Sequence, residues 1–216
     1  GNVNVAIGYN TGQALTSGTQ NTLLGALAGD ALTTGASNVA IGYAALGAED
    51  DHGTVVAIGY QALTAQNAGA SSYNIAVGYQ AGLSVSTGIN NILVGGKAGD
   101  SLTSGSYNTA IGHEALASED AHGKNVAIGH TALATLNAGA DGFNTAVGFG
   151  SGAVMETGTK NTLIGATTGD ALTTGINNTA VGYDALSTSV DGDNNTAIGY
   201  LALRVYEDGD GNGNNT

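Results

Sequence analysis

A five-residue motif recurs along the whole chain: asparagine, a β-branched residue, alanine or leucine, an aliphatic residue, and glycine. We call the closing residues the marker glycines and number other positions relative to them. They stand at Gly8, Gly25, Gly42, Gly59, Gly78, Gly95, Gly112, Gly129, Gly148, Gly165, Gly182 and Gly199. The differences between successive numbers are 17, 17, 17 and 19, a series that totals 70 and then repeats. The chain is therefore one repetitive segment over 1–216, with twelve units in three superrepeats at about 4–73, 74–143 and 144–213.

Within each motif, hydrophobic residues alternate in the way typical of a short strand. Positions −3 and −1 carry β-branched or aliphatic residues, as in Val5 and Ile7, which favours a strand that the marker glycine ends. A helix is excluded because most units contain two or three glycines, each costing about 1 kcal/mol in a helix interior. Units this small bury their apolar faces only by stacking. We therefore predict an all-β fold, a parallel β-solenoid of twelve coils with about 17–19 residues each.

The expected core consists of aliphatic side chains stacked from coil to coil. At a strand spacing of about 4.8 Å, twelve coils form a rod about 58 Å long. We expect the Ile and Val side chains of the strands to point inward. The alanines of position −2, such as Ala6 and Ala40, would then leave a flat outer face on which a neighbouring chain packs. A large aliphatic residue at position +4 or +7, such as Leu46 or Leu32, returns to the core, which indicates two strands per coil in a flattened roll.

Asparagine occupies position −4 in every unit but one, where Val55 replaces it. Stacked amides can bond to their neighbours and can also satisfy local backbone groups. We therefore expect a structural asparagine ladder formed by Asn4, Asn21, Asn38, Asn74, Asn91, Asn108, Asn125, Asn144, Asn161, Asn178 and Asn195.

Composition excludes several classes of protein. Four Lys and Arg residues oppose 17 Asp and Glu residues, a net charge of −13, and such a surface repels nucleic acid and anionic lipid. The absence of cysteine excludes disulfides and thiolate sites, and no apolar run reaches the length of a membrane-spanning helix. Because phosphate-binding loops, hydrolase elbows and His-Glu-x-x-His motifs are also absent, we expect no enzyme, no nucleic-acid partner and no membrane insertion.

The motif resembles the repeats of known fibrous proteins. The strings Asn4-Val5-Ala6-Ile7-Gly8-Tyr9 and Asn195-Thr196-Ala197-Ile198-Gly199-Tyr200-Leu201-Ala202-Leu203 resemble repeats in the heads of trimeric autotransporter adhesins and in phage tail fibres. The resemblance covers the whole chain. It implies a left-handed parallel β-roll with three chains side by side, in an extracellular location on a virion or a cell surface. Adhesin heads have shorter coils, and this difference favours a fibre shaft.

The resemblance thus predicts the structural shaft of an extracellular fibre, a phage tail fibre or a bacterial surface filament, that projects a host- or surface-binding tip. The alternative is an adhesive module that itself binds glycan or matrix protein. The expected partner is the chain itself, as a homotrimer or lateral homo-oligomer, while a host surface or glycan would contact parts outside this segment. Both ends of the repeat lack a cap composition, so we expect a fragment of a longer fibre.

Position +1 carries a column of aromatic and imidazole side chains. The column consists of Tyr9, Tyr43, Tyr60, Tyr79, His113, His130, Phe149, Tyr183 and Tyr200. Such rings serve as a platform for glycan or partner, or they simply cover an edge or fill a subunit interface. His113 and His130 lie one coil apart, but spacing places no third metal ligand beside them. An ice-binding face is disfavoured because threonine at position −3 alternates with Val and Ile.

Acidic side chains gather in two loops, Glu49-Asp50-Asp51-His52 and Glu119-Asp120-Ala121-His122, which lie one superrepeat apart. Carboxylates beside histidine can perform acid–base chemistry. The third copy reads Ser189-Val190-Asp191-Gly192, so we interpret these loops as solvated turns. We expect no cofactor, with calcium as the alternative, because Asp208, Asp210 and Asn212 alternate with glycines as in calcium-binding loops. Turns rich in glycine, asparagine and aspartate have the same composition without an ion.

Overall fold

The chain folds as an all-β protein, and the computed structural model describes residues 3–205 and 215. No helix occurs among these residues, and each motif forms one strand of three residues. The strands are β1 Val5–Ile7, β2 Thr22–Leu24, β3 Val39–Ile41, β4 Val56–Ile58, β5 Ile75–Val77, β6 Ile92–Val94, β7 Thr109–Ile111, β8 Val126–Ile128, β9 Thr145–Val147, β10 Thr162–Ile164, β11 Thr179–Val181 and β12 Thr196–Ile198.

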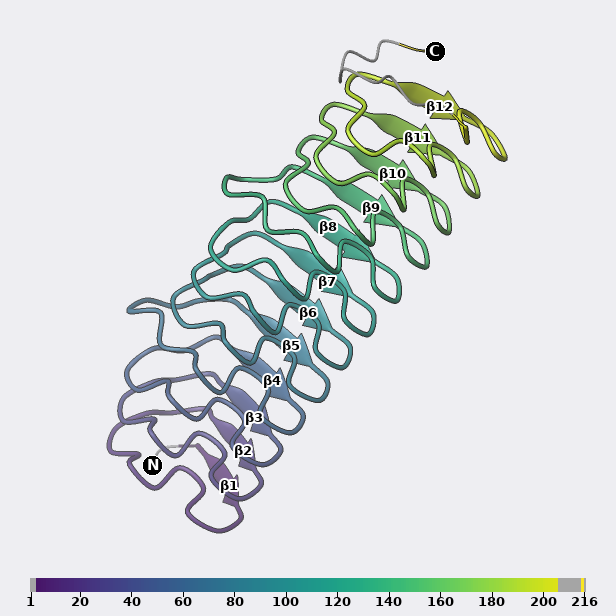
Figure 1. Ribbon diagram of the computed structural model, residues 1–216. Helices are drawn as coiled ribbons and strands as arrows, with labels where there is room; N and C mark the ends of the chain where they lie inside the picture. Colours follow the sequence, from purple (N-terminus) through teal and green to yellow (C-terminus); the bar gives the residue numbers. More distant parts are fainter. Residues whose placement is uncertain (1–2, 206–214, 216) are drawn as a thin grey trace.

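All twelve strands form one parallel sheet in sequence order, and the chain winds through about eleven turns to connect them (Figure 1). The register follows the motif, because Ile7 of β1 pairs with Leu24 of β2 and the same pairing continues to β12. Equivalent residues of successive units therefore lie over one another. The predicted parallel β-solenoid is confirmed, and the molecule is an elongated rod with its ends far apart (Figure 1).

Each coil contains one strand in the described structure, so the prediction of two strands per coil is wrong. The rest of the coil consists of turns whose amides bond to the next coil, as from Gly12 N to Ala28 O at 3.0 Å. Left-handed residues interrupt the extended conformation there: Ala44 has a φ of 52° and Leu46 a φ of 55°. A second strand does not form because a strand needs consecutive residues in the β region.

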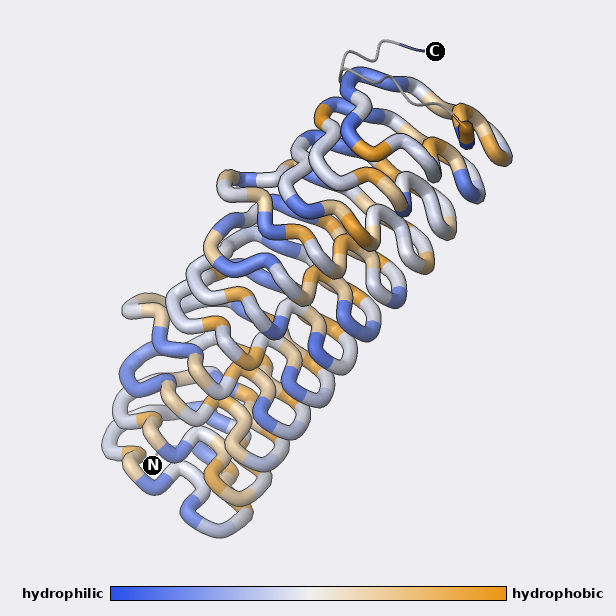
Figure 2. Tube along the Cα trace, viewed as in Figure 1, coloured by the Kyte–Doolittle hydropathy of each residue, from blue (hydrophilic) through white to orange (hydrophobic). Residues whose placement is uncertain are grey.

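The strand faces are the reverse of our prediction. Ala40 and Leu23, both at position −2, are fully buried, whereas Val39 and Ile41 on either side of Ala40 are only half-buried. The narrow coil accounts for this orientation, since its interior already holds Leu46 from position +4 and leaves space mainly for small side chains. Figure 2 shows hydrophobic and hydrophilic stretches alternating around each coil.

The large aliphatic residues expected at positions +4 and +7 do lie in the core. Leu46 and Leu63 represent position +4, and Leu32 and Leu102 represent position +7; all four are fully buried. A further column at position +3, mostly alanine, is also buried, for example at Ala45. The solenoid therefore has a continuous but narrow core in which small and large side chains alternate.

The marker glycines permit the close stacking of coils. A Cβ atom placed on Gly42 would lie 2.3 Å from the carbonyl oxygen of Gly59 in the next coil, and the φ of Gly42 is 132°. No other residue type fits both the contact and the backbone conformation.

Candidate functional site

The outward face of the sheet carries aliphatic side chains along the whole rod, mixed with threonine toward its C-terminal end. We define the outer sheet face as the first and last residues of all twelve strands. The side chains of Leu24, Ile92, Ile111 and Ile164 on this face are 37–43% exposed. Threonine replaces the aliphatic residue at the first position of six strands, including all of β9 to β12. The face is consequently most apolar toward the N-terminal two thirds of the described chain.

The outer sheet face is large for an exposed apolar surface. Twelve strands about 4.8 Å apart and side-chain columns spanning about 12 Å give a projected area of roughly 700 Å², to which six threonines contribute. The largest apolar patch of a typical monomer is about 300–600 Å², and a standard protein interface buries about 800 Å² on each partner. The area of this face therefore exceeds that of the largest patch on a typical monomer and approaches one side of a standard interface.

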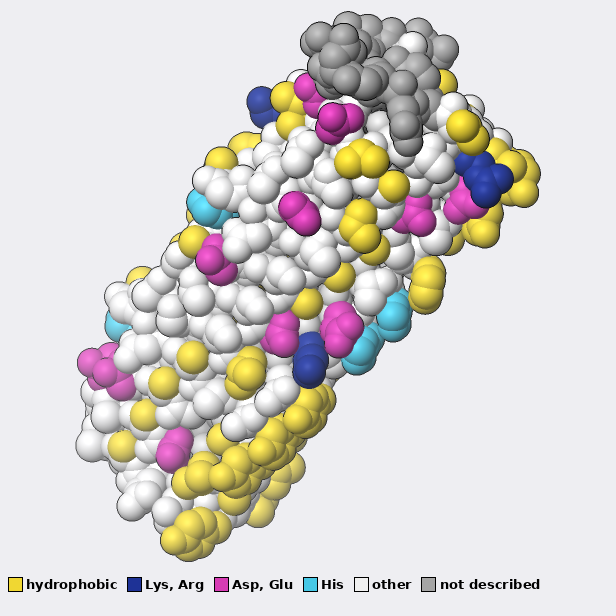
Figure 3. Space-filling view, viewed as in Figure 1, with side chains coloured by type: hydrophobic (Ala, Val, Ile, Leu, Met, Phe, Trp, Pro, Cys, Tyr) yellow, Lys and Arg dark blue, Asp and Glu magenta, His cyan; other side chains and the backbone are white. Residues whose placement is uncertain are grey.

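The aromatic column of position +1 lies beside the sheet and remains exposed. Tyr43, Tyr60 and Tyr79 form a stack with ring centroids 5.4 and 5.3 Å apart. His113, His130 and Phe149 form a second stack at 5.4 and 5.2 Å, and Tyr183 lies 5.8 Å from Tyr200. Hydrophobic and histidine side chains accordingly follow one edge of the rod in Figure 3.

Small residues interrupt the aromatic column once in every superrepeat, at Ala26, Gly96 and Ala166. The column is therefore a series of short stacks. Tyr9 is 75% exposed and Tyr79 54% exposed, so the edges of these rings are accessible. The rings of His113 and His130 stack on each other, and Glu114 Oε2 lies 3.9 Å from His113 Nδ1.

The asparagines of position −4 bond mainly to backbone groups, one in the turn that closes the same coil and one at the start of the next coil. Asn91 Nδ2 donates to Gly105 O at 2.9 Å, and Asn91 Oδ1 accepts from the amide of Asn108 at 2.9 Å. The same pair of bonds is made by Asn4, Asn21, Asn38, Asn74, Asn144, Asn161 and Asn178. Asn108 makes the same pair with slightly longer bonds. Asn125 Oδ1 accepts from the amide of Asn144 at 3.2 Å, but its Nδ2 donates to Gly123 O, two residues earlier, at 3.2 Å. Asn195 Oδ1 accepts from the amide of Asn215 at 3.3 Å. Side-chain amides of neighbouring coils also bond directly, as from Asn161 to Asn144 at 3.3 Å.

The two acidic loops are not simple solvated turns, which corrects our interpretation of the sequence. Glu49 and Glu119 are fully buried, whereas the rings of His52 and His122 are 31% exposed. Both glutamates occupy position +7, which in the preceding coil holds the core residues Leu32 and Leu102. The equivalence of Glu49 with Leu32 is visible in the sequence, and it is the signal from which the burial could have been predicted.

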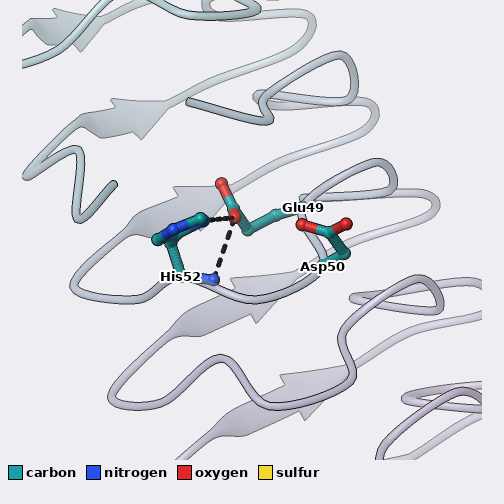
Figure 4. A group of neighbouring side chains, drawn as sticks. All are labelled: Glu49, Asp50 and His52. Atoms are coloured by element: carbon teal, nitrogen blue, oxygen red, sulfur yellow. Dashed lines mark hydrogen bonds and ion pairs between the residues drawn. The ribbon is translucent and has the colours of Figure 1, made fainter. Parts of the chain in front are cut away.

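Each buried carboxylate is held by its own loop and by the next coil. Glu119 Oε1 accepts from the amide of His122 at 3.3 Å, and Oε2 accepts from the amide of Ala138 at 3.3 Å. Burial raises the pKa of Glu119, and the amides of Ala138 and His122 partly oppose that shift. Burial likewise raises the pKa of Glu49, and the amide and ring of His52 partly oppose that rise (Figure 4).

The third superrepeat has a different loop, in which buried Ser189 stands at the position of the two glutamates and exposed Asp191 follows. Within the described residues, the groups of three side chains able to hold a metal ion are Glu49, Asp50 and His52, and Glu119, Asp120 and His122. The predicted calcium ligands Asp208, Asp210 and Asn212 lie outside the described residues.

Over residues 3–205 and 215, the structure has no cavity and no helix with the length and apolar character needed to cross a bilayer. Comparison of the chain with family models, with curated proteins and with solved structures finds no significant match to any of them.

Proposed function

We propose that this chain is part of the shaft of an extracellular fibre, on a virion or a bacterial surface, in which three copies associate side by side. In this proposal each chain winds as a left-handed roll, and the shaft holds a host- or surface-binding tip away from its anchor. The role is structural and not catalytic. The observation that carries the proposal is the outer sheet face, which extends along the entire rod.

The physical argument is that a narrow solenoid gains stability by covering this face. Much of the core is alanine, which buries little apolar area per residue. The half-exposed Val and Ile columns provide further area that becomes buried only when another molecule covers them. Because the columns are straight and repeat at each strand, a second copy offers a surface of matching length and spacing. The resemblance of the motif to trimeric fibre repeats favours three copies.

The oligomeric mass in solution tests the proposal. We expect three times the chain mass of 21.0 kDa by light scattering on a size-exclusion column. The double variant Ile92→Arg/Ile111→Arg places two charges on the outer sheet face, and we expect it to dissociate into monomers that retain the β-sheet signal in circular dichroism. A matched control, Ser101→Arg/Ser104→Arg, adds the same charge at exposed turn positions and should remain trimeric.

A monomeric mass for the unaltered chain would contradict the trimeric shaft. So would a trimer that persists, with unchanged stability, in the Ile92→Arg/Ile111→Arg variant, since the apolar face would then not be the interface.

The exposed aromatic stacks favour a second candidate, an adhesive module. Stacked tyrosines such as Tyr43, Tyr60 and Tyr79 present ring edges and hydroxyl groups to solvent, and rings of this kind bind partner surfaces. Binding of the chain to a glycan array, lost in a Tyr60→Ala/Tyr79→Ala variant that keeps its oligomeric mass, would support adhesion. A shaft without adhesive function should give no signal on the array.

A further inference from the structure

The acidic loops after β3 and β7 place a carboxylate in the core next to a histidine. Glu49 and Glu119 stand in the column that aliphatic residues occupy in the preceding coils, and both are fully buried. Asp50 and His52 lie beside Glu49 and are only half-buried, so the cluster reaches solvent through them (Figure 4). A buried carboxylate is unfavourable unless hydrogen bonds or a cation compensate its charge.

The loop leaves some of these polar atoms without compensation. The Nδ1 atoms of His52 and His122 are buried and have no hydrogen-bond partner in the described structure, and the same holds for Oε2 of Glu49. His52 Nδ1 does lie 3.4 Å from Oε1 of Glu49, but this contact lacks hydrogen-bond geometry. The backbone amide of Ala68 partly opposes the rise in the pKa of Glu49. Its position does not give Oε2 of Glu49 a hydrogen bond of good geometry.

In each loop one pair of these atoms has the spacing of two ligands around one metal ion. Two ligands of a tetrahedral zinc ion, each bound at about 2.0–2.1 Å, lie about 3.3 Å apart. The Nδ1 and Oε1 atoms are 3.4 Å apart in the first loop and 3.5 Å apart in the second. A carboxylate oxygen of the aspartate completes each group, in which all three ligand atoms lie within 4.8 Å of one another.

We propose that each of these two loops binds one divalent transition-metal ion of the zinc class. The ligands are His52 Nδ1 with carboxylate oxygens of Glu49 and Asp50, and in the second loop His122, Glu119 and Asp120, with water in the remaining position. A ligand set of one imidazole and two carboxylates suits zinc better than calcium, which takes oxygen ligands only.

The ion would tie successive coils together at a loop. Asp50 and Asp120 accept, through their backbone carbonyls, from the amides of Thr33 and Thr103 in the preceding coil. Glu119 accepts from Ala138 in the following coil. A metal at this point therefore strengthens a loop that is already hydrogen-bonded to the coils on both sides. Burial of the two glutamates raises their pKa, and the positive charge of the ion offsets the cost of burying their negative charge.

The third superrepeat provides an internal test of stoichiometry. Ser189, Val190 and Gly192 replace the ligands Glu, Asp and His there. The inference therefore predicts two ions per chain, and not three, because one of the three superrepeats lacks the ligands.

Native mass spectrometry and calorimetric titration with Zn²⁺ test the inference on protein first treated with a chelator and then desalted. We expect two zinc ions per chain, one in each of the variants His52→Ala and His122→Ala, and none in the double variant. The matched control is His113→Ala/His130→Ala, which removes the only other histidines and should still bind two ions. Zinc should also raise the melting temperature of the unaltered chain but not that of the His52→Ala/His122→Ala variant.

Absence of zinc binding by the unaltered chain would overturn the inference, whatever the variants do. Two ions retained in the His52→Ala/His122→Ala variant would also overturn it, and so would ions lost in the His113→Ala/His130→Ala control. These outcomes are independent of the fibre proposal, because they do not depend on the oligomeric mass.

Discussion

The side chain of Asn91 bonds to the backbone amide of Asn108, one coil further along, at 2.9 Å. The Nδ2 atom of the same side chain donates to the carbonyl oxygen of Gly105, in the turn that closes the coil, at 2.9 Å. One buried amide therefore satisfies two backbone groups that the turn leaves unpaired. This relationship repeats along the rod and explains why asparagine, and not a longer or purely apolar residue, stands at position −4.

Substitution of Asn91 by alanine should destabilise the protein by about 2–6 kcal/mol, because it leaves two buried backbone groups without partners at about 1–3 kcal/mol each. Denaturant unfolding followed by circular dichroism measures the loss. Asn137→Ala is the control, since Asn137 is exposed and its loss should change the stability by less than about 0.5 kcal/mol. Equal effects of the two substitutions would contradict the structural role of the asparagine column.

Substitution of Gly112 by alanine should cost about 3 kcal/mol or more, through steric overlap and backbone strain. The added Cβ would lie 2.3 Å from Gly129 O, and the φ of Gly112 is 138°. In Gly139, by contrast, the φ is 67° and a Cβ would have nothing within 4 Å. Gly139→Ala should therefore cost only about 1 kcal/mol of backbone strain. A larger loss for Gly139→Ala would show that coil stacking does not depend on the marker glycines.

At position +2, where the backbone is left-handed, replacing glycine by alanine and replacing alanine by glycine should change the stability in opposite directions. Ala44 has a φ of 52° and Gly150 a φ of 63°. Gly150→Ala should destabilise by about 1 kcal/mol, because a Cβ there meets only Thr167 Cγ2 at 3.7 Å and backbone strain remains. Ala44→Gly should stabilise by about 0.5 kcal/mol, the relief of strain being partly offset by greater freedom of the unfolded chain. Thermal unfolding distinguishes the two signs, and changes of the same sign would contradict the prediction.

Stability of the metal-free protein should fall as the pH rises from about 4.5 toward neutrality, in part because of Glu49 and Glu119. Their pKa values are raised in the folded state from the ordinary value of 4.5, so the folded chain holds these protons to a higher pH than the unfolded chain. Glu119→Leu, which introduces the residue found at position 102 one coil earlier, should reduce this decline. Unfolding measured between pH 4 and 7 tests the sign.

Asp141 provides the opposite control for that pH series. The Lys124 ammonium lowers the pKa of this exposed carboxyl, so its contribution is present above the ordinary pKa of aspartate and is lost as the pH falls below it. Asp141→Asn should therefore leave the decline between pH 4.5 and 7 unchanged. A decline of equal size in the Glu119→Leu variant and the unaltered chain would mean that other groups cause it.

The repeat spacing alone was enough to predict the parallel solenoid. Twelve motifs of nearly equal length, each with alternating hydrophobic residues and a glycine, have one simple way to bury their apolar residues, which is to stack in register. The pairing of Ile7 with Leu24 follows from that spacing, because identical units repeat the same local geometry.

Which face of the strand points inward was decided only by the tertiary structure. A period of two places Val39 and Ile41 on one side and Ala40 on the other, but it does not say which side is the core. The coil closes too tightly for two columns of branched side chains, so Ala40 is buried and its neighbours face outward. A hint existed in the sequence, since position −3 admits threonine six times and position −2 never carries a polar residue.

The burial of Glu49 likewise depends on the path of the whole coil. In sequence it reads as the start of an acidic turn, but its distance from Gly42 equals that of Leu32 from Gly25. Stacking in register carries every residue at that distance into the core column, whatever its polarity. The sequence by itself thus determined the repeat and its register, whereas the closure of each coil in three dimensions determined which side chains are enclosed and which remain free to bind.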